Sequence, residues 1–174
     1  MKPKALNLTL TALFAVIISV CSMLSFPAAV PFTLQTFGIF LALFLLGGKY
    51  GTLSIAVYVI LGLTGLPVFH NFTGGIGILM SGTGGYITGF ILAGLLYAVI
   101  TKLFGNRSTV KLTAAFAGLI LCYITGTLWF TFTASPNEGF LPALLTCVVP
   151  YIVPDVVKIL LALFIAKRTE KLAR

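Results

Sequence analysis

Residues 112–132 read LTAAFAGLILCYITGTLWFTF, a run of mostly apolar side chains without a single charge. About 20 apolar residues in a helix cross the roughly 30 Å hydrocarbon layer of a bilayer, because each residue adds about 1.5 Å along the helix axis. This run is long enough to span a membrane, and it predicts a transmembrane helix.

The composition of the whole chain agrees with that prediction. Of the 174 residues, 59% are hydrophobic and only 8% are charged, whereas a soluble domain carries about 25% charged residues. We therefore expect lipid to solvate most of the surface. The net charge of +8 does not indicate nucleic-acid binding, since the basic residues lie in short segments between apolar runs and form no continuous basic face.

Six membrane-spanning segments are predicted, which makes the chain an all-α membrane protein with one domain over residues 1–174. The first apolar run is longer than the 7–15 residues usual for a signal peptide, so we expect it to remain as a helix. The second and third segments are short and are separated by Gly48-Lys49-Tyr50, which predicts a tight helical hairpin or two tilted helices. The segments lie at about residues 5–25, 34–47, 51–66, 84–103, 112–132 and 152–166.

The basic residues predict the orientation of these segments. With six spans and a cytoplasmic N-terminus, ten basic residues fall on the inner side, whereas the outer segments 26–33, 67–83 and 133–151 contain no Lys or Arg. This asymmetry follows the positive-inside rule and predicts that both termini are cytoplasmic. The inner residues are Lys2, Lys4, Lys49, Lys102, Arg107, Lys111, Lys167, Arg168, Lys171 and Arg174.

Asp155 and Lys158 are the charged pair predicted to lie within or at the edge of an apolar span. An ionised side chain is costly in a bilayer, so such residues are candidates for a functional site. The two are three residues apart and project from nearly the same face of a helix. With Pro154 in the first helical turn, Asp155 would lie where the helix dipole favours a carboxylate. The pair either caps the helix and does nothing more, or contacts a polar ligand.

The predicted outer loop at residues 67–83 is rich in glycine and also contains Ile76, Ile78, Leu79 and Met80. This composition predicts a loop folded against the protein that caps or lines a cavity. Weaker candidates for the same site are Gln35 at the start of the second span, His70 and Asn71 in the loop, and Tyr86 at the start of the fourth span.

Three stretches resemble the BioY family of biotin-binding S components from energy-coupling factor (ECF) transporters. They are VPFTLQT at 30–36, GGIG at 74–77 with SGTGGYITGF at 81–90, and PYIVPDVVK at 150–158. The resemblance covers about residues 8–166. The chain departs from the family pattern at Ser81-Gly82, where Gly-Pro is usual, and at Val153-Pro154, where Pro-Gly is common.

The resemblance implies a six-helix protein of the bacterial cell membrane that binds biotin near the outer face. It implies that Asp155 and Lys158 contact biotin and that Thr83, Gly84, Gly85 and Tyr86 belong to the wall of the pocket. It also implies partners, namely a transmembrane coupling subunit and two ATP-binding subunits.

In this family the first helix docks on the partner through alanines four residues apart, and the nearest match here is Thr11, Ala15 and Ser19. These are small residues that permit close packing of helices.

The expected role is ligand capture without catalysis, cofactor or metal. The chain has no Walker A motif, so ATP hydrolysis would occur on the partners. Phe69, Phe72 and Tyr86 are expected to cover the apolar part of biotin. The alternatives are an S component for another vitamin, a small intramembrane enzyme, and a membrane protein without a ligand. Which end of biotin Lys158 contacts stays open.

Overall fold

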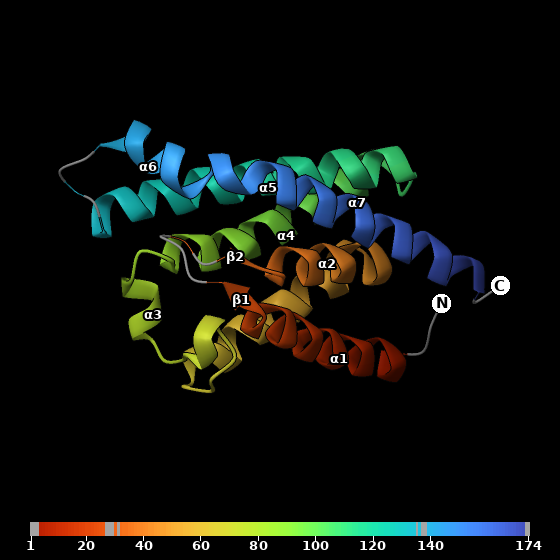
Figure 1. Ribbon diagram of the computed structural model, residues 1–174. Coiled ribbons are helices and arrows are strands. Elements are labelled where there is room, and N and C mark those ends of the chain that lie inside the picture. Colours follow the sequence, from red (N-terminus) through yellow and green to blue (C-terminus); the bar gives the residue numbers. More distant parts are fainter. Residues whose placement is uncertain (1–3, 27–29, 31, 135, 137–138, 173–174) are drawn as a thin grey trace.

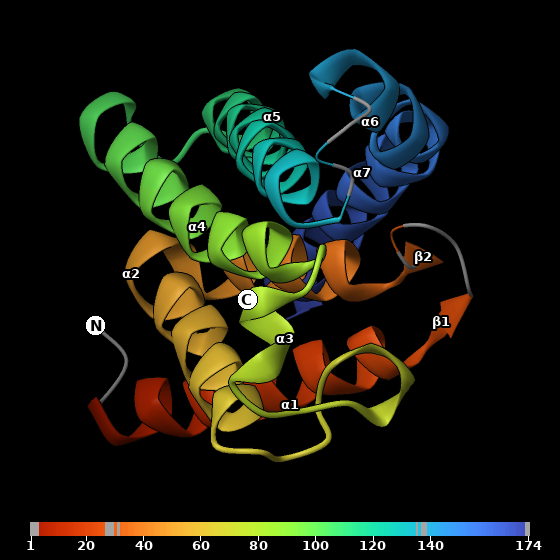
Figure 2. The same ribbon diagram turned by 90° about the vertical axis from the view of Figure 1, so that its left-hand side faces the viewer.

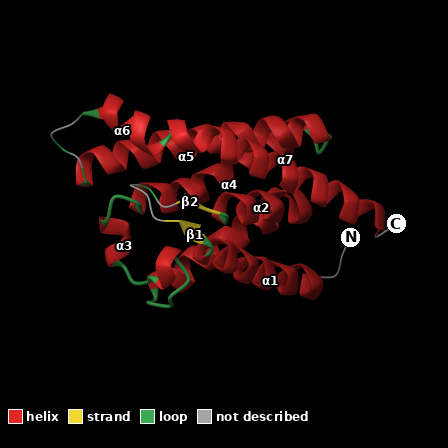
Figure 3. Ribbon diagram, viewed as in Figure 1, coloured by secondary structure: helices red, strands yellow, loops and turns green. Residues whose placement is uncertain are grey.

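The computed structural model describes residues 4–26, 30, 32–134, 136 and 139–172. Within these residues, five helices are long and apolar enough to cross a membrane, and they run lengthwise through the molecule (Figures 1 and 3). The prediction of an all-α membrane protein is thereby confirmed. These helices are α1 (Lys4–Met23), α2 (Gln35–Leu63), α4 (Gly84–Phe104), α5 (Ser108–Thr133) and α7 (Val149–Leu172).

Short elements connect these helices. Strands β1 (Ser25–Phe26) and β2 (Phe32–Thr33) form an antiparallel pair between α1 and α2, with Ser25 opposite Thr33. The loop before α4 contains the 3-10 helix η1 (His70–Phe72) and helix α3 (Gly77–Met80), and α6 (Phe140–Cys147) precedes α7. The helices α3 and α6 lie at the end of the molecule opposite the two termini (Figure 1).

Helix α2 covers both the second and the third predicted span. It is not continuous, because its helical backbone is interrupted at Gly47. The φ angle of Gly47 is +77°, a conformation that side chains with a Cβ rarely adopt. Residues eight apart in a straight helix are about 12 Å apart, yet a Cβ placed on Gly51 would lie 2.8 Å from the Cα of Leu43. The chain therefore folds back sharply at Gly47, as the sequence predicts. Whether each half crosses a membrane, which would make six spans, stays a prediction.

The break in α2 leaves carbonyl groups at the end of its first half without the usual helical partners. The ammonium group of Lys111 in α5 donates a hydrogen bond to the carbonyl of Phe44 at 3.3 Å, and it pairs with Glu170 of α7 at 3.2 Å. A cation at a helix C-terminus is also favoured by the helix dipole. Lys111 thus joins α2, α5 and α7 at one end of the bundle.

The predicted inner segments lie at one end of the molecule. The start of α1, the turn between α4 and α5 and the end of α7 are all near the termini (Figure 1). Of the predicted inner residues, Lys2 and Arg174 lie outside the described part of the chain. Which side of a membrane this end faces stays a prediction.

Glycine residues allow α4 and α5 to pack closely. A Cβ on Gly85 would lie 2.2 Å from the Cβ of Trp129 and 2.7 Å from the carbonyl oxygen of Thr125, and one on Gly118 would lie 3.2 Å from Ala93. Only a hydrogen atom fits at Gly85, whereas a Cβ at Gly118 would make a tight contact. This is the close contact through small residues that is common between membrane helices.

Small residues of α1 also lie where two helices of this chain pack together. Thr11, Ala15 and Ser19 are 3%, 1% and 6% exposed, and this face of α1 packs against α2. The predicted docking face for a partner is therefore covered by the protein itself. The sequence predicted that these small residues dock on a partner, but in the structure they are buried within the chain.

The start of α7 differs from the prediction. The helix begins at Val149, so Pro154 lies inside it and Asp155 lies nearly two turns from its N-terminus. The helix dipole acts mainly within the first turn, and it does not explain the position of Asp155. Because Pro154 has no N–H, the carbonyl four residues earlier also receives no helical hydrogen bond.

The outer segments are only partly as predicted. Phe69 is buried in the loop before α4, but Phe72, Ile76 and Met80 are 67%, 74% and 73% exposed, so these apolar side chains do not fold inward. The segment 133–151 was expected to be a connecting segment, and the structure shows that it contains α6.

Candidate binding site for a small molecule

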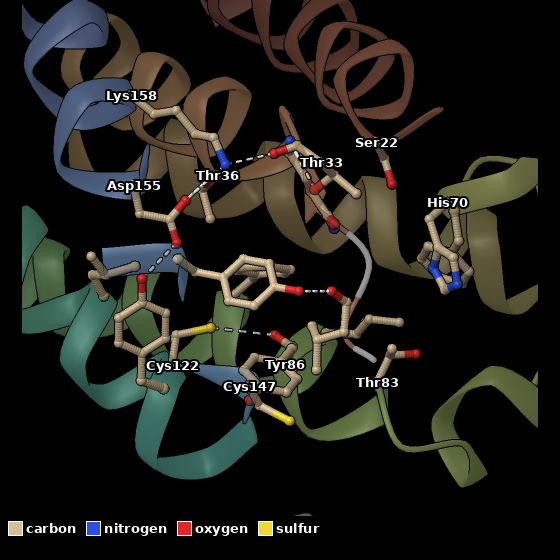
Figure 4. Close-up of a pocket in the computed structure, with 18 of the residues that line it drawn as sticks. Ser22, Thr33, Thr36, His70, Thr83, Tyr86, Cys122, Cys147, Asp155 and Lys158 are labelled. Atoms are coloured by element: carbon tan, nitrogen blue, oxygen red, sulfur yellow. Dashed lines mark hydrogen bonds and ion pairs between the residues drawn. The ribbon is translucent and has the colours of Figure 1, made fainter. Parts of the chain in front are cut away.

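A cavity lies between the helices, and its lining residues are drawn in Figure 4. Its space amounts to about 660 Å³ with the open mouth included, which is in the usual range for a small-molecule site. Its walls come from α1, α2, α4, α5, α6, α7 and the loops, and they are largely apolar with a few polar groups, as in most ligand sites.

Asp155 lies at one end of this cavity and is 4% exposed (Figure 4). Its Oδ1 accepts hydrogen bonds from Lys158 at 2.8 Å and from Thr36 at 2.9 Å, and its Oδ2 accepts one from Tyr123 at 2.7 Å. A carboxylate has about four acceptor positions. These three donors hold the side chain in place and leave about one position for a ligand.

Lys158 is 7% exposed and is equally well held. Its ammonium group donates to Asp155 and, at 2.7 Å, to the carbonyl of Thr33, and it lies 4.2 Å from the centre of the Phe32 ring. The last contact has the geometry of a cation–π interaction. The ammonium group has three N–H donors, and Asp155 and Thr33 accept two of them, so one remains for a ligand oxygen.

The buried pair has no net charge. A buried ion pair gains little for stability because removing two charges from water is costly, so a role in helix capping alone explains it poorly. It offers an acceptor and a donor at one end of an apolar cavity. This arrangement suits a neutral polar group that both donates and accepts hydrogen bonds.

A chain of hydrogen bonds supplies a second polar wall. Gln35, which is 8% exposed, donates from Nε2 to the hydroxyl of Tyr58 at 2.9 Å, and Tyr58 donates to Ser22 at 3.0 Å. All three side chains line the cavity. The structure thus brings Gln35 to the same cavity as Asp155 and Lys158, as expected.

The motif at the start of α4 contributes two lining residues. Thr83 and Tyr86 face the cavity, and the hydroxyl of Tyr86 is 3.2 Å from that of Thr127. Gly84 and Gly85 are buried but do not line the cavity. A Cβ on Gly84 would lie 2.0 Å from the carbonyl oxygen of Leu79, so these glycines position Tyr86 by allowing the backbone to pack closely.

Two predicted residues lie away from the cavity. Asn71 is exposed and accepts a hydrogen bond from Ser25 at 3.0 Å, with a φ angle of +52°. It fastens the outer loop to β1 and does not face the ligand. Phe72 is also outside the cavity, whereas Phe69 lines it as expected.

Several lining residues were missed in the sequence. Thr36 and Tyr123 bind Asp155, and Tyr151 donates a hydrogen bond to the carbonyl of Val30 and stacks on Phe32 at 6.2 Å between ring centres. Thr36 and Tyr151 lie within the stretches that carry the family resemblance, and this was an available signal. Tyr123 and Cys147 carry no such signal, because isolated tyrosines and cysteines are common in membrane helices.

His70 lies on the cavity wall outside the spanning helices and is half-buried. Burial lowers the pKa of its imidazole from the ordinary value, because the charged form loses hydration. Burial therefore favours the neutral form of His70.

This lowered pKa predicts a dependence of stability on pH. As the pH falls through about 6.5, His70 takes up a proton in the unfolded chain before it does so in the folded protein, so the free energy of unfolding decreases. Thermal unfolding between pH 8 and pH 5 should show a larger loss of Tm for the wild type than for His70→Gln. Equal losses in the two proteins would contradict this effect.

The fold and the site define a class, that of multi-pass membrane proteins that enclose a small-molecule cavity containing a buried ion pair. The sequence matches the BioY family over residues 1–174. It is 39% identical to a probable biotin transporter BioY from Pyrococcus horikoshii, over 96% of this chain and 98% of the relative, and 38% identical to the biotin transporter BioY of Thermotoga maritima, over 92% and 93%.

The fold is also similar to a crystal structure of the S component for biotin from an ECF-type ABC transporter. The TM-score is 0.85 at 30% sequence identity, and the match covers 97% of this chain and 92% of the other. The chain therefore belongs to the BioY family. It is a multi-pass protein of the cell membrane, and its family consists of transport proteins rather than enzymes.

Proposed function

We propose that this chain is the biotin-binding S component of an ECF-type transporter and that the cavity around Asp155 and Lys158 is the biotin site. The observation that carries the proposal is the buried ion pair, which has no net charge, at one end of a mostly apolar cavity. The names of the relatives, which are biotin transporters, support biotin as the ligand.

The chemistry of biotin suits these residues. Its ureido ring offers two N–H donors and a carbonyl, its fused rings are apolar and compact, and its tail ends in a carboxylate. Asp155 accepts a hydrogen bond from a ureido N–H, and Lys158 donates to the carbonyl or to the carboxylate. Phe69, Tyr86 and the aliphatic residues of the wall cover the apolar part.

Retention of radiolabelled biotin by the purified protein tests this proposal. Unlabelled biotin should displace the label, whereas thiamine and riboflavin at the same concentration should not. Displacement by thiamine or riboflavin, with no preference for biotin, would assign the chain to another vitamin.

Transport is proposed to depend on partners. A transmembrane coupling subunit and two ATP-binding subunits would reorient the loaded protein at the expense of ATP. Cells that produce this chain with those subunits should accumulate labelled biotin, and a variant of the ATP-binding subunits that cannot hydrolyse ATP should abolish accumulation. Equal uptake in both would mean that the chain transports without them.

Tyr123→Phe should lower the free energy of unfolding by about 1.5–3 kcal/mol, the usual contribution of a hydrogen bond to a charged group. The substitution removes a hydroxyl that donates to Asp155 at 2.7 Å and holds its carboxylate in place, so the affinity for biotin should fall as well. The matched control is Tyr97→Phe, because the hydroxyl of Tyr97 is buried without a hydrogen-bond partner in the described part of the chain. Titration with labelled biotin should give wild-type affinity for the control, and the same result for Tyr123→Phe would show that this hydroxyl does not position Asp155.

A further inference from the structure

A second hollow lies outside the biotin cavity, on the surface between the second half of α2 and α4. This groove has about 640 Å³ of space with open solvent included, and its lining residues all belong to these two helices. The helices lie side by side at the edge of the bundle (Figure 2). The lining residues are Gly48, Lys49, Thr52, Leu53, Ala56, Ile91, Leu95 and Ala98.

The groove is almost wholly apolar and faces outward. Leu53 and Leu95 on its two sides are 40% and 50% exposed. Its floor is formed where the two helices touch, since a Cβ on Gly48 would lie 2.4 Å from the Cα of Ala98. In a membrane, an outward-facing apolar groove of this kind is open to the acyl chains of lipids.

Positive charge lies at one end of the groove only. Lys49 lines the groove at the end where α2 folds back. Lys102 follows Ala98 by one turn on the same face of α4 and is exposed. Neither α2 nor α4 contains an acidic residue, so no acid on these helices neutralises the two lysines.

We propose that this groove binds an anionic glycerophospholipid, with one acyl chain between α2 and α4 and the phosphate against Lys49 and Lys102. Such a lipid matches the groove. Its acyl chain is apolar like the groove walls, and its single anionic end meets the two lysines. Basic pockets between membrane helices on the cytoplasmic side are suited to anionic headgroups, and the positive end of this groove lies at the predicted inner end of the bundle. The inference is independent of the biotin site, since no residue that lines the groove also lines that cavity.

Native mass spectrometry of the full chain in detergent tests the proposal with two lipids that share acyl chains and differ in headgroup. Phosphatidylglycerol should remain bound to the wild type at concentrations where phosphatidylcholine does not. Lys49→Gln with Lys102→Gln should reduce retention of phosphatidylglycerol by about fivefold for each lysine. Ala56→Phe, which fills the groove and keeps both lysines, should also reduce it.

The matched control is Lys167→Gln with Arg168→Gln, which removes two exposed basic residues from the end of α7, away from the groove. It should retain phosphatidylglycerol like the wild type. Circular dichroism and elution as a single species establish that each variant is folded. Equal retention of the two lipids by the wild type, no retention of either lipid, or equal losses in the two double variants would overturn the proposal.

Discussion

Lys158→Met is expected to lower the free energy of unfolding by about 3–5 kcal/mol, because it leaves the charge of Asp155 buried without its cation. Asp155 is 4% exposed, and only the hydroxyls of Thr36 and Tyr123 would remain as its donors. The same variant should lose biotin binding. Denaturant or thermal unfolding in detergent measures the first effect, and retention of labelled biotin measures the second.

The control for this experiment restores neutrality. Asp155→Asn together with Lys158→Met removes both charges and keeps the shapes of the side chains, so most of the lost stability should return. Biotin binding should not return to wild-type affinity, since the ammonium donor is lost and the amide in place of the carboxylate is an uncharged, weaker acceptor. A double variant that is stable and still binds biotin with wild-type affinity would show that the pair is structural only.

Gly85→Ala is expected to destabilise the protein by about 1–3 kcal/mol, the usual cost of overpacking a close contact. The added methyl group would meet the Cβ of Trp129 at 2.2 Å and the backbone oxygen of Thr125 at 2.7 Å. Because a backbone atom cannot rotate away, α4 and α5 must separate. Tyr86 and Tyr123 lie on these two helices, so affinity for biotin should fall as well.

Gly77→Ala is the matched control for Gly85→Ala. A Cβ on Gly77 has no neighbour within 4 Å, and its φ angle is not positive. It begins the short helix α3, where alanine is favoured over glycine. Thermal unfolding of this variant should match or exceed that of the wild type. A Gly85→Ala protein as stable as Gly77→Ala would contradict the account of α4–α5 packing.

The membrane helices could be predicted from sequence because each spanning helix must form its own backbone hydrogen bonds and expose apolar side chains to the lipid. A run such as 112–132 carries that information without reference to the rest of the chain. The break near Gly47 could also be predicted from local sequence, because two adjacent glycines beside a lysine interrupt an apolar run. Helix α6 was missed because its eight residues are too few to span and lie in a segment assigned to the outside.

The candidate site was predicted through Asp155 and Lys158, whose cost in a membrane is a property of the residues themselves. The partners that hold them were not, because Thr36 and Tyr123 are 119 and 32 residues from Asp155 and meet it only through the packing of helices. The error at Thr11 has another cause. Small residues four apart favour close packing, but the spacing does not distinguish a helix of the same chain from one of a partner.

Thermal unfolding of the detergent-solubilised protein with and without biotin tests the central claim most directly. A ligand that binds only the folded state raises its stability in proportion to the logarithm of the ligand concentration over Kd. The account predicts that biotin raises the Tm of the wild type, that thiamine does not, and that biotin has no effect on the Asp155→Asn, Lys158→Met double variant. An unchanged Tm of the wild type at saturating biotin, or an equal rise in the double variant, would contradict the assignment of Asp155 and Lys158 to a biotin site.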